Sequence, residues 1–163
     1  MVENIFLQSV LKEFHDYKKL GDKTFEQVSE KDFHFLPNKE CNSIAIIIQH
    51  IHGNMLSRWT NFLIEDGEKN WRKRDDEFEM HLMNKEQLVQ LWEEGWELVF
   101  KVIESLKEED LTKTIYIREQ PHTVIAAINR QLTHYASHVG QIILLGKIIK
   151  GAEWKTLSIP KKK

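Results

Sequence analysis

Four long stretches of this 163-residue chain carry apolar residues at the three- and four-residue spacing of an amphipathic helix. These stripes predict helices near residues 2–28, 43–66, 84–107 and 123–150. Alternating strand character occurs in one place, "TKTIYIREQPHTV", which predicts a short β-hairpin near Thr112–His122. Four apolar stripes must be buried against one another, so the expected fold class is all-α, as a four-helix bundle.

Capping residues predict where three of these helices begin. Ser43 and Thr123 stand directly before the second and fourth stripes, and Asn84 with Gln87 forms the capping-box pattern before the third. The second helix is expected to end just before Gly67. The connection that follows is long and polar. It is long enough to cross the bundle between helices two and three, so a simple up-down-up-down topology does not follow.

Length and composition predict a single domain spanning residues 1–163. The net charge of −2 gives no general attraction to nucleic acid or to an anionic membrane. No segment approaches the roughly 20 consecutive apolar residues of a membrane helix. The single Cys41 cannot form an internal disulfide, and the first residues lack the pattern of a signal peptide. We therefore expect a cytoplasmic protein that binds neither nucleic acid nor membrane.

The stretch "QLTHYASHVGQI" places His134 and His138 one helical turn apart on a face expected to point inward. Two imidazoles in this arrangement can bind one metal ion. The spacing alone is weak support, because it also arises by chance and because buried structural histidines can occupy such positions. Tyr135 stands where the "HExxH" motif of zinc proteases needs its glutamate base, which argues against that mechanism.

The second helix offers a third ligand in "IIIQHIHGNM". His50 and His52 are about 200° apart around a helix, so only one of them can face the site. His50 shares the more apolar side and is the predicted ligand. Asn54 and Asn61 continue its face and would give a cavity a polar lining. Arg58 lies about 80° from His50, within reach of an anionic substrate, but the favoured role for it is at the surface.

The start "NSIAIIIQH", followed far downstream by "LTHYASHVGQI", resembles the DinB/YfiT-like superfamily. That superfamily consists of four-helix bundles of this length, with a long crossover between helices two and three. The resemblance implies that His50, His134 and His138 are metal ligands, with Gly140 and Gln141 matching the pair that commonly follows them. The stretches "QHIHGNMLSRW" and "EQPHTVIAAINRQLTHY" resemble a Bacillus-type branch that has no settled activity.

Three neutral imidazoles would leave a divalent metal ion its full charge and an open coordination position, as in catalytic sites. Zinc and nickel suit imidazole best, and iron and manganese remain alternatives. Gln141 is close enough along the helix to hold a ligand or a water. Protons compete for the same nitrogens, so stabilisation by the metal is expected to fade between roughly pH 6 and pH 5.

Two classes of function fit this ligand set. In the first, the protein is a metal-dependent enzyme acting on a small molecule. It would be a thiol-dependent S-transferase, as some relatives suggest with a low-molecular-weight thiol at the metal, or a small hydrolase. In the second, it is a non-catalytic metal-binding or stress-linked interaction bundle. The enzyme requires a polar pocket open to solvent, lined by residues such as Asn54, Arg58 or Asn61. The second class requires a closed site or a fourth protein ligand.

The third stripe also bears on assembly. It carries a generous apolar surface for one helix, formed by Leu88, Leu91, Trp92, Trp96 and Val99. Proteins of the DinB/YfiT-like superfamily are often dimers, so we expect a homodimer. The alternative is that these residues fill the core of one chain.

Overall fold

The computed structural model describes residues 2–160, with side chains from residue 5 onward. It has four long helices: α1 (Val2–Phe25), α2 (Ile44–Trp59), α3 (Lys85–Ser105) and α4 (Val124–Lys150). Strands β1 (Thr114–Ile117) and β2 (Gln120–Thr123) pair antiparallel as a small two-stranded sheet. Short 3-10 turns complete the elements: η1 (Glu30–His34), η2 (Asp75–Phe78), η3 (Glu108–Asp110) and η4 (Gly151–Glu153). The chain is mostly helical, as predicted.

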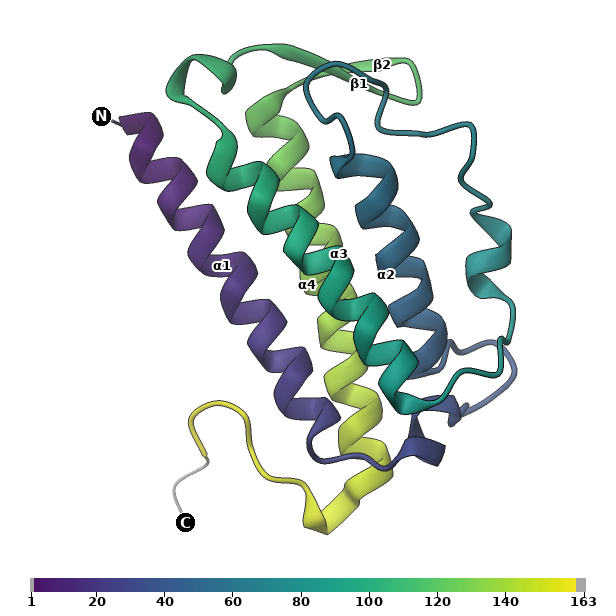
Figure 1. Cartoon of the computed structure of the whole chain (residues 1–163). Helices are drawn as coiled ribbons and strands as arrows, with labels where there is room; N and C mark the ends of the chain where they lie inside the picture. Colours follow the sequence, from purple (N-terminus) through teal and green to yellow (C-terminus); the bar gives the residue numbers. More distant parts are fainter. Residues whose placement is uncertain (1, 161–163) are drawn as a thin grey trace.

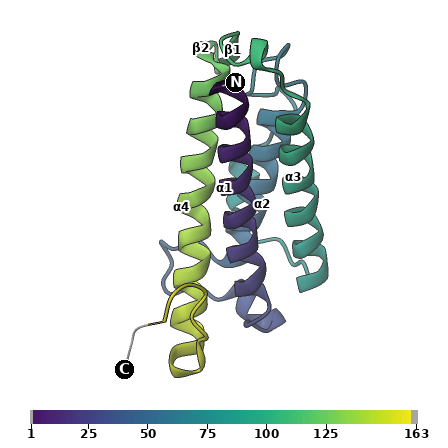
Figure 2. The same ribbon diagram turned by 90° about the vertical axis from the view of Figure 1, so that its left-hand side faces the viewer.

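The four long helices lie side by side, and the sheet covers one end of them (Figures 1 and 2). Helix α2 packs against α3, and α1 packs against α4. The segment 60–84, here called the crossover, returns along the outer side of α2, so that α3 runs in the same direction as α2 (Figure 1). None of the helices in the described part of the chain combines the length and the apolar character needed to span a bilayer.

The predicted capping residues are confirmed. The Ser43 and Thr123 side chains accept hydrogen bonds from the backbone N–H groups of Ile46 and Ala126, which starts α2 and α4. Asn84 and Gln87 form the reciprocal capping box of α3. Each cap satisfies an N–H group that has no partner inside its helix. The starts of the two histidine-bearing helices are therefore encoded locally.

The predicted end of the second helix is wrong, because α2 ends at Trp59 and not near residue 66. Asn61 turns the chain away with a left-handed φ of 52°. Gly67 is not a helix cap. Its N–H donates to the Tyr116 carbonyl of β1 at 2.8 Å, and its carbonyl accepts from the Arg58 side chain. These long-range contacts replace the last turns of the expected helix. Helix α1 likewise ends early, at Phe25 rather than at residue 28.

The core is dominated by aromatic side chains from all four helices. Phe14, Trp59, Trp92, Trp96 and Tyr135 are each at most 1% exposed. Phe14 meets Trp59 edge-on, with ring centroids 6.2 Å apart, and Trp92 meets Trp96 at 5.5 Å. Such edge-to-face contacts add directional packing to apolar burial, and they fix how the helices sit against one another.

This core accounts for most of the apolar surface of α3. Leu88, Trp92, Trp96 and Val99 are buried within one chain, and Leu91 is half-buried. These side chains therefore leave little apolar surface for a partner. The homodimer stays a prediction, but α3 does not provide the reason for it.

Candidate metal centre

Three histidines from two helices converge beside α2. His50 comes from α2, and His134 and His138 come from consecutive turns of α4. One ring nitrogen of each lies within 4.8 Å of those of the other two. His134 Nε2 is 3.3 Å from His50 Nε2 and 3.1 Å from His138 Nε2. The ring nitrogens of the three predicted ligand residues thus lie close enough together to bind one ion.

His52 lies elsewhere. Its Nε2 is 3.0 Å from Oε2 of Glu94 on α3, on a different side of α2 from His50. Within residues 2–160, no second group of three or more histidine, cysteine or acidic side chains has the spacing of a metal site.

Hydrogen bonds at the outer ring nitrogens determine what the inner nitrogens offer. His50 Nδ1 lies 2.9 Å from Glu77 Oε2, and His138 Nδ1 lies 3.1 Å from Gln141 Oε1. Both oxygens accept, so both Nδ1 atoms donate, and in the neutral rings each Nε2 presents a lone pair. His134 Nε2 can give a proton to only one of them, so at least one inner nitrogen keeps a lone pair that no donor of the triad faces. This donor set fits a cation.

The environment keeps the α4 imidazoles neutral. Burial, and then repulsion from His138 and His50 when these are charged, lowers the pKa of His134 to about 3. Burial is also the main cause that lowers the pKa of His138, although its hydrogen bond to Gln141 opposes the shift. Neutral imidazole is the form that binds metal.

Glu77, which holds His50, is itself held in place. Arg72 grips its carboxylate with two hydrogen bonds, Nε to Oε1 at 2.7 Å and Nη2 to Oε2 at 2.8 Å. Burial alone would raise the pKa of Glu77, but the hydrogen bonds from Arg72 and His50 hold it below its usual value. Gly53 of α2 leaves the space, because a Cβ there would lie 2.2 Å from Glu77 Oε1. The arrangement is the carboxylate–histidine pair common at metal sites.

We expect Glu77→Gln to weaken zinc binding by about 10- to 100-fold, since it removes the charge that orients His50. Gly53→Ala should act in the same direction, by displacing the Glu77 carboxylate. The matched control is Glu94→Gln, which removes the carboxylate beside His52. Competition titration with a zinc indicator measures all three. Equal affinities for the Glu77 variant and the wild type would show that this carboxylate does not support the site.

A buried hydrogen-bond chain sets the rotation of α4 relative to α2. The Tyr135 hydroxyl donates to Asn54 Oδ1 at 3.0 Å and accepts from Trp59 Nε1 at 2.9 Å. Burial raises the pKa of Tyr135, so the phenol keeps its proton. The residue between the two α4 histidines thus ties α4 to α2, and this directs His134 toward His50.

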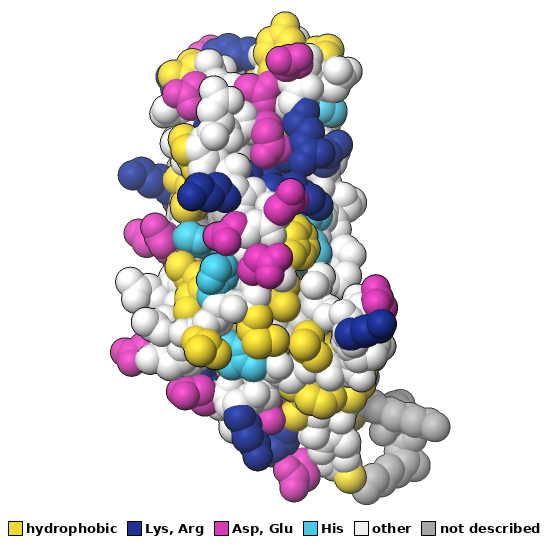
Figure 3. Space-filling model, turned by 90° about the vertical axis from the view of Figure 1, so that its right-hand side faces the viewer, with side chains coloured by type: hydrophobic (Ala, Val, Ile, Leu, Met, Phe, Trp, Pro, Cys, Tyr) yellow, Lys and Arg dark blue, Asp and Glu magenta, His cyan; other side chains and the backbone are white. Residues whose placement is uncertain are grey.

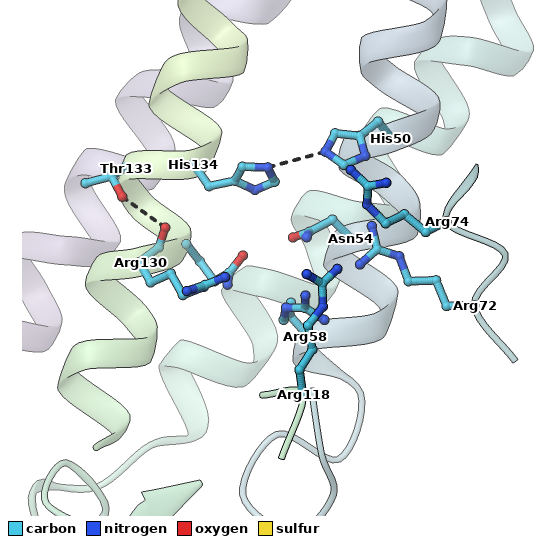
Figure 4. A pocket seen from close by; sticks show the side chains of 10 residues that line it. His50, Asn54, Arg58, Arg72, Arg74, Arg118, Arg130, Thr133 and His134 are labelled. Carbon is cyan, nitrogen blue, oxygen red and sulfur yellow. Dashed lines mark hydrogen bonds between the residues drawn. The ribbon is translucent and has the colours of Figure 1, made fainter. Parts of the chain in front are cut away.

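A cavity of about 380 Å³ adjoins the triad and has His50 and His134 in its wall (Figure 4). Asn54 and Arg58 line it as predicted. Arg58 is only 5% exposed, so the surface role favoured for it from the sequence is wrong. Asn61 does not line the cavity. It lies beyond the end of α2, and its side chain donates to Glu65 instead.

Sequence reasoning missed several residues of this site. Glu77 and Arg72 belong to the crossover, where no periodic pattern indicates which side chains point inward. Gln141, by contrast, was predicted to hold a ligand or a water, and it holds the predicted ligand His138 by accepting a hydrogen bond from its Nδ1. The one local signal for Glu77 was Gly53, a glycine inside a helix, which often marks a close approach.

Comparison with known proteins identifies the family. The family model described as "Protein of unknown function (DUF1572)" matches residues 1–163. No curated protein matches the chain. The fold is similar to a crystal structure of a conserved protein from Enterococcus faecalis, at a TM-score of 0.68 and 15% identity, covering 88% of this chain and 96% of that one. The chain therefore belongs to the DUF1572 family, which is DinB-like.

Proposed function

We propose that this protein is a metal-dependent enzyme in which His50, His134 and His138 hold a divalent ion, zinc or nickel, within a four-helix bundle of the DinB/YfiT-like type. The supporting observation is the cavity, which shares His50 and His134 with the triad. In the described part of the chain the triad has no fourth histidine, cysteine or acidic ligand. An open position beside a cavity is typical of catalytic metal sites rather than structural ones.

In this proposal each residue of the site has a separate role. The three Nε2 atoms bind the ion, Glu77 orients His50, and Gln141 orients His138. When bound, such an ion lowers the pKa of a water or thiol in its open position, which makes a nucleophile near neutral pH. The side chains of the cavity would bind the rest of the substrate.

Thiol transfer fits this cavity better than hydrolysis. No aspartate or glutamate is among the described residues that line it. Glu77 is engaged by Arg72 and His50. A bound metal would lower the pKa of a water as well as that of a thiol, but hydrolysis would still need a group that passes a proton to the leaving group. Transfer of a thiolate to an electrophile that releases a halide would need no such group. We therefore infer a thiol-dependent S-transferase, and we expect it to act in the cytoplasm.

The test combines metal analysis with a reaction. Protein loaded with zinc or nickel is mixed with a low-molecular-weight thiol and 1-chloro-2,4-dinitrobenzene, and formation of the thioether is followed. Sulfur bonds to the ring carbon, and chloride leaves. We expect turnover that a chelator or His134→Ala abolishes and that His52→Ala, the matched control, retains. One bound ion without turnover for any thiol would instead favour the non-catalytic metal-binding or stress-linked interaction protein.

A further inference from the structure

Five arginines surround the cavity beside the triad. They come from four separate segments: Arg58 from α2, Arg72 and Arg74 from the crossover, Arg118 from the turn of the sheet, and Arg130 from α4. Their side chains converge on the space between α2 and α4 (Figure 4). On the face of the molecule that carries the crossover, basic side chains gather in the upper half, with acidic ones among them (Figure 3). The fold thus brings four separate segments of the chain together to form this cavity.

Carboxylates neutralise this cluster only in part. Glu68 lies within 3.5 Å of Arg58, Arg72 and Arg118, so a single acidic group serves three guanidinium groups. The other partners are Glu77 for Arg72 and Asp75 for Arg74. Arg130 has no ion pair with any described residue. Five arginines thus face three carboxylates, and the excess positive charge lies around the cavity.

Two buried side chains in the wall lack partners for particular atoms. Arg58 is 5% exposed, and its Nε has no hydrogen-bond partner among the described residues. Gln131 is 2% exposed, and its Oε1 likewise has none. Buried polar atoms are normally satisfied, so these two atoms call for a ligand or an ordered water as partner. The first requires an acceptor from that partner, and the second requires a donor.

The position of Arg118 is held against backbone preference. Arg118 and Glu119 both have left-handed φ values, 54° and 63°, which glycine or asparagine usually supplies. The Asp66 carboxylate accepts hydrogen bonds from both of their backbone N–H groups, at 2.9 and 2.8 Å. Ile117 pairs with Gln120, so Arg118 and Glu119 form a two-residue hairpin turn, for which left-handed φ values are usual. Here they place a guanidinium group at the cavity.

We propose that this cavity is an anion-binding subsite, which takes the carboxylate or phosphate group of a small molecule together with a hydroxyl or amino group that donates to Gln131. The volume of about 380 Å³ suits a small molecule rather than a polymer. Guanidinium groups are the preferred partners of planar carboxylates and of phosphates. Binding of the anion does not depend on the metal. Its part in substrate recognition, with the reactive end of the molecule at the triad, rests on the proposed function.

The test uses calorimetric titration of metal-free protein at low ionic strength. The probes are succinate, inorganic phosphate and the uncharged analogue succinamide. Succinate or phosphate should bind and succinamide should not, and comparison of the two anions identifies the preferred group. Arg130→Gln should weaken anion binding by about tenfold, the loss of one charge-assisted contact. This variant keeps its fold, because Arg130 is exposed and has no described ion pair.

Lys147→Gln is the matched control, since it removes the same charge from an exposed position farther along α4. It should leave the dissociation constant within about twofold of wild type, as expected for a distant surface charge. The subsite is refuted if neither anion binds, or if Lys147→Gln weakens binding as much as Arg130→Gln. Zinc stoichiometry is measured on the same samples. Anion binding by protein that takes up no zinc would refute the proposed function alone, and zinc uptake without anion binding would refute the subsite alone.

Discussion

We expect His50→Ala to abolish stoichiometric zinc binding and His52→Ala to leave it nearly intact. His50 contributes one of three nitrogens that converge within 4.8 Å. His52 faces α3, where its charged partner is Glu94. Two remaining imidazoles do not hold a divalent ion firmly, so the loss should be close to complete rather than partial. The measurement is the metal content of the purified variants after dialysis against a zinc buffer.

The two variants control for each other, because each removes one imidazole from α2. Circular dichroism should show a helical protein in both cases, since the aromatic core does not include either ring. The reverse outcome, with zinc lost from the His52 variant and kept by the His50 variant, would refute the ligand assignment. It would also remove the residue-by-residue match to the DinB/YfiT-like superfamily.

Zinc should raise the melting temperature strongly at pH 8, and the lowered pKa values of His134 and His138 should move the loss of this effect to lower pH than unperturbed histidines predict. At a free zinc concentration 100-fold above the dissociation constant, mass action stabilises the folded state by about 2.7 kcal/mol. For a chain of this length that corresponds to roughly 5 to 11 °C. From the unperturbed pKa of histidine, the stabilisation by zinc was expected to fade between roughly pH 6 and pH 5. The folded pKa of His134, about 3, moves proton competition at this residue to lower pH.

The metal-free protein should behave differently. An unfolded histidine gains its proton near pH 6.5, whereas folded His134 does so only near pH 3. Between these values the unfolded state binds more protons, so stability falls as the pH drops from about 6.5 toward 3. The lowered pKa of His138 adds to the loss.

Thermal melts with chelator and with zinc, from pH 8 to pH 4, separate these two effects. His134→Ala should remove the zinc effect together with the part of the acid sensitivity that His134 causes, and should leave a folded protein. If chelator leaves the melting temperature unchanged at pH 8, the histidines are structural residues of the core.

Local chemistry made the helix starts predictable, but it did not make their ends predictable. Ser43, Asn84 and Thr123 each act on an N–H group three residues away, so a short window of sequence contains the whole interaction. The end of α2 depends on Gly67 and Tyr116, which are almost fifty positions apart in the chain. No short pattern carries that information, and a glycine that usually marks a helix end proved misleading.

The candidate site likewise has residues that could be predicted from the sequence and residues that could not. Helical periodicity and the resemblance placed His50, His134 and His138 together, because regular elements fix the direction of their side chains. Glu77 reaches His50 from an irregular segment whose path only the three-dimensional structure reveals. The arginines were unpredictable as a group, since four segments supply them and only Arg58 lies on the histidine face of α2.

The crossover gives this family a way to diverge. Phe62, near its start, packs on Trp59 of the core, and its further course along the outside of α2 places Arg72 and Arg74 at the cavity. Insertions and substitutions are tolerated far better in such a segment than in packed helices. Under the proposed function, a substitution at Arg74 would change which molecules the cavity admits, whereas a substitution at Arg72 would also release the Glu77 carboxylate that holds His50. Through Arg72, a change of selectivity in this segment would therefore also reach the three-histidine group.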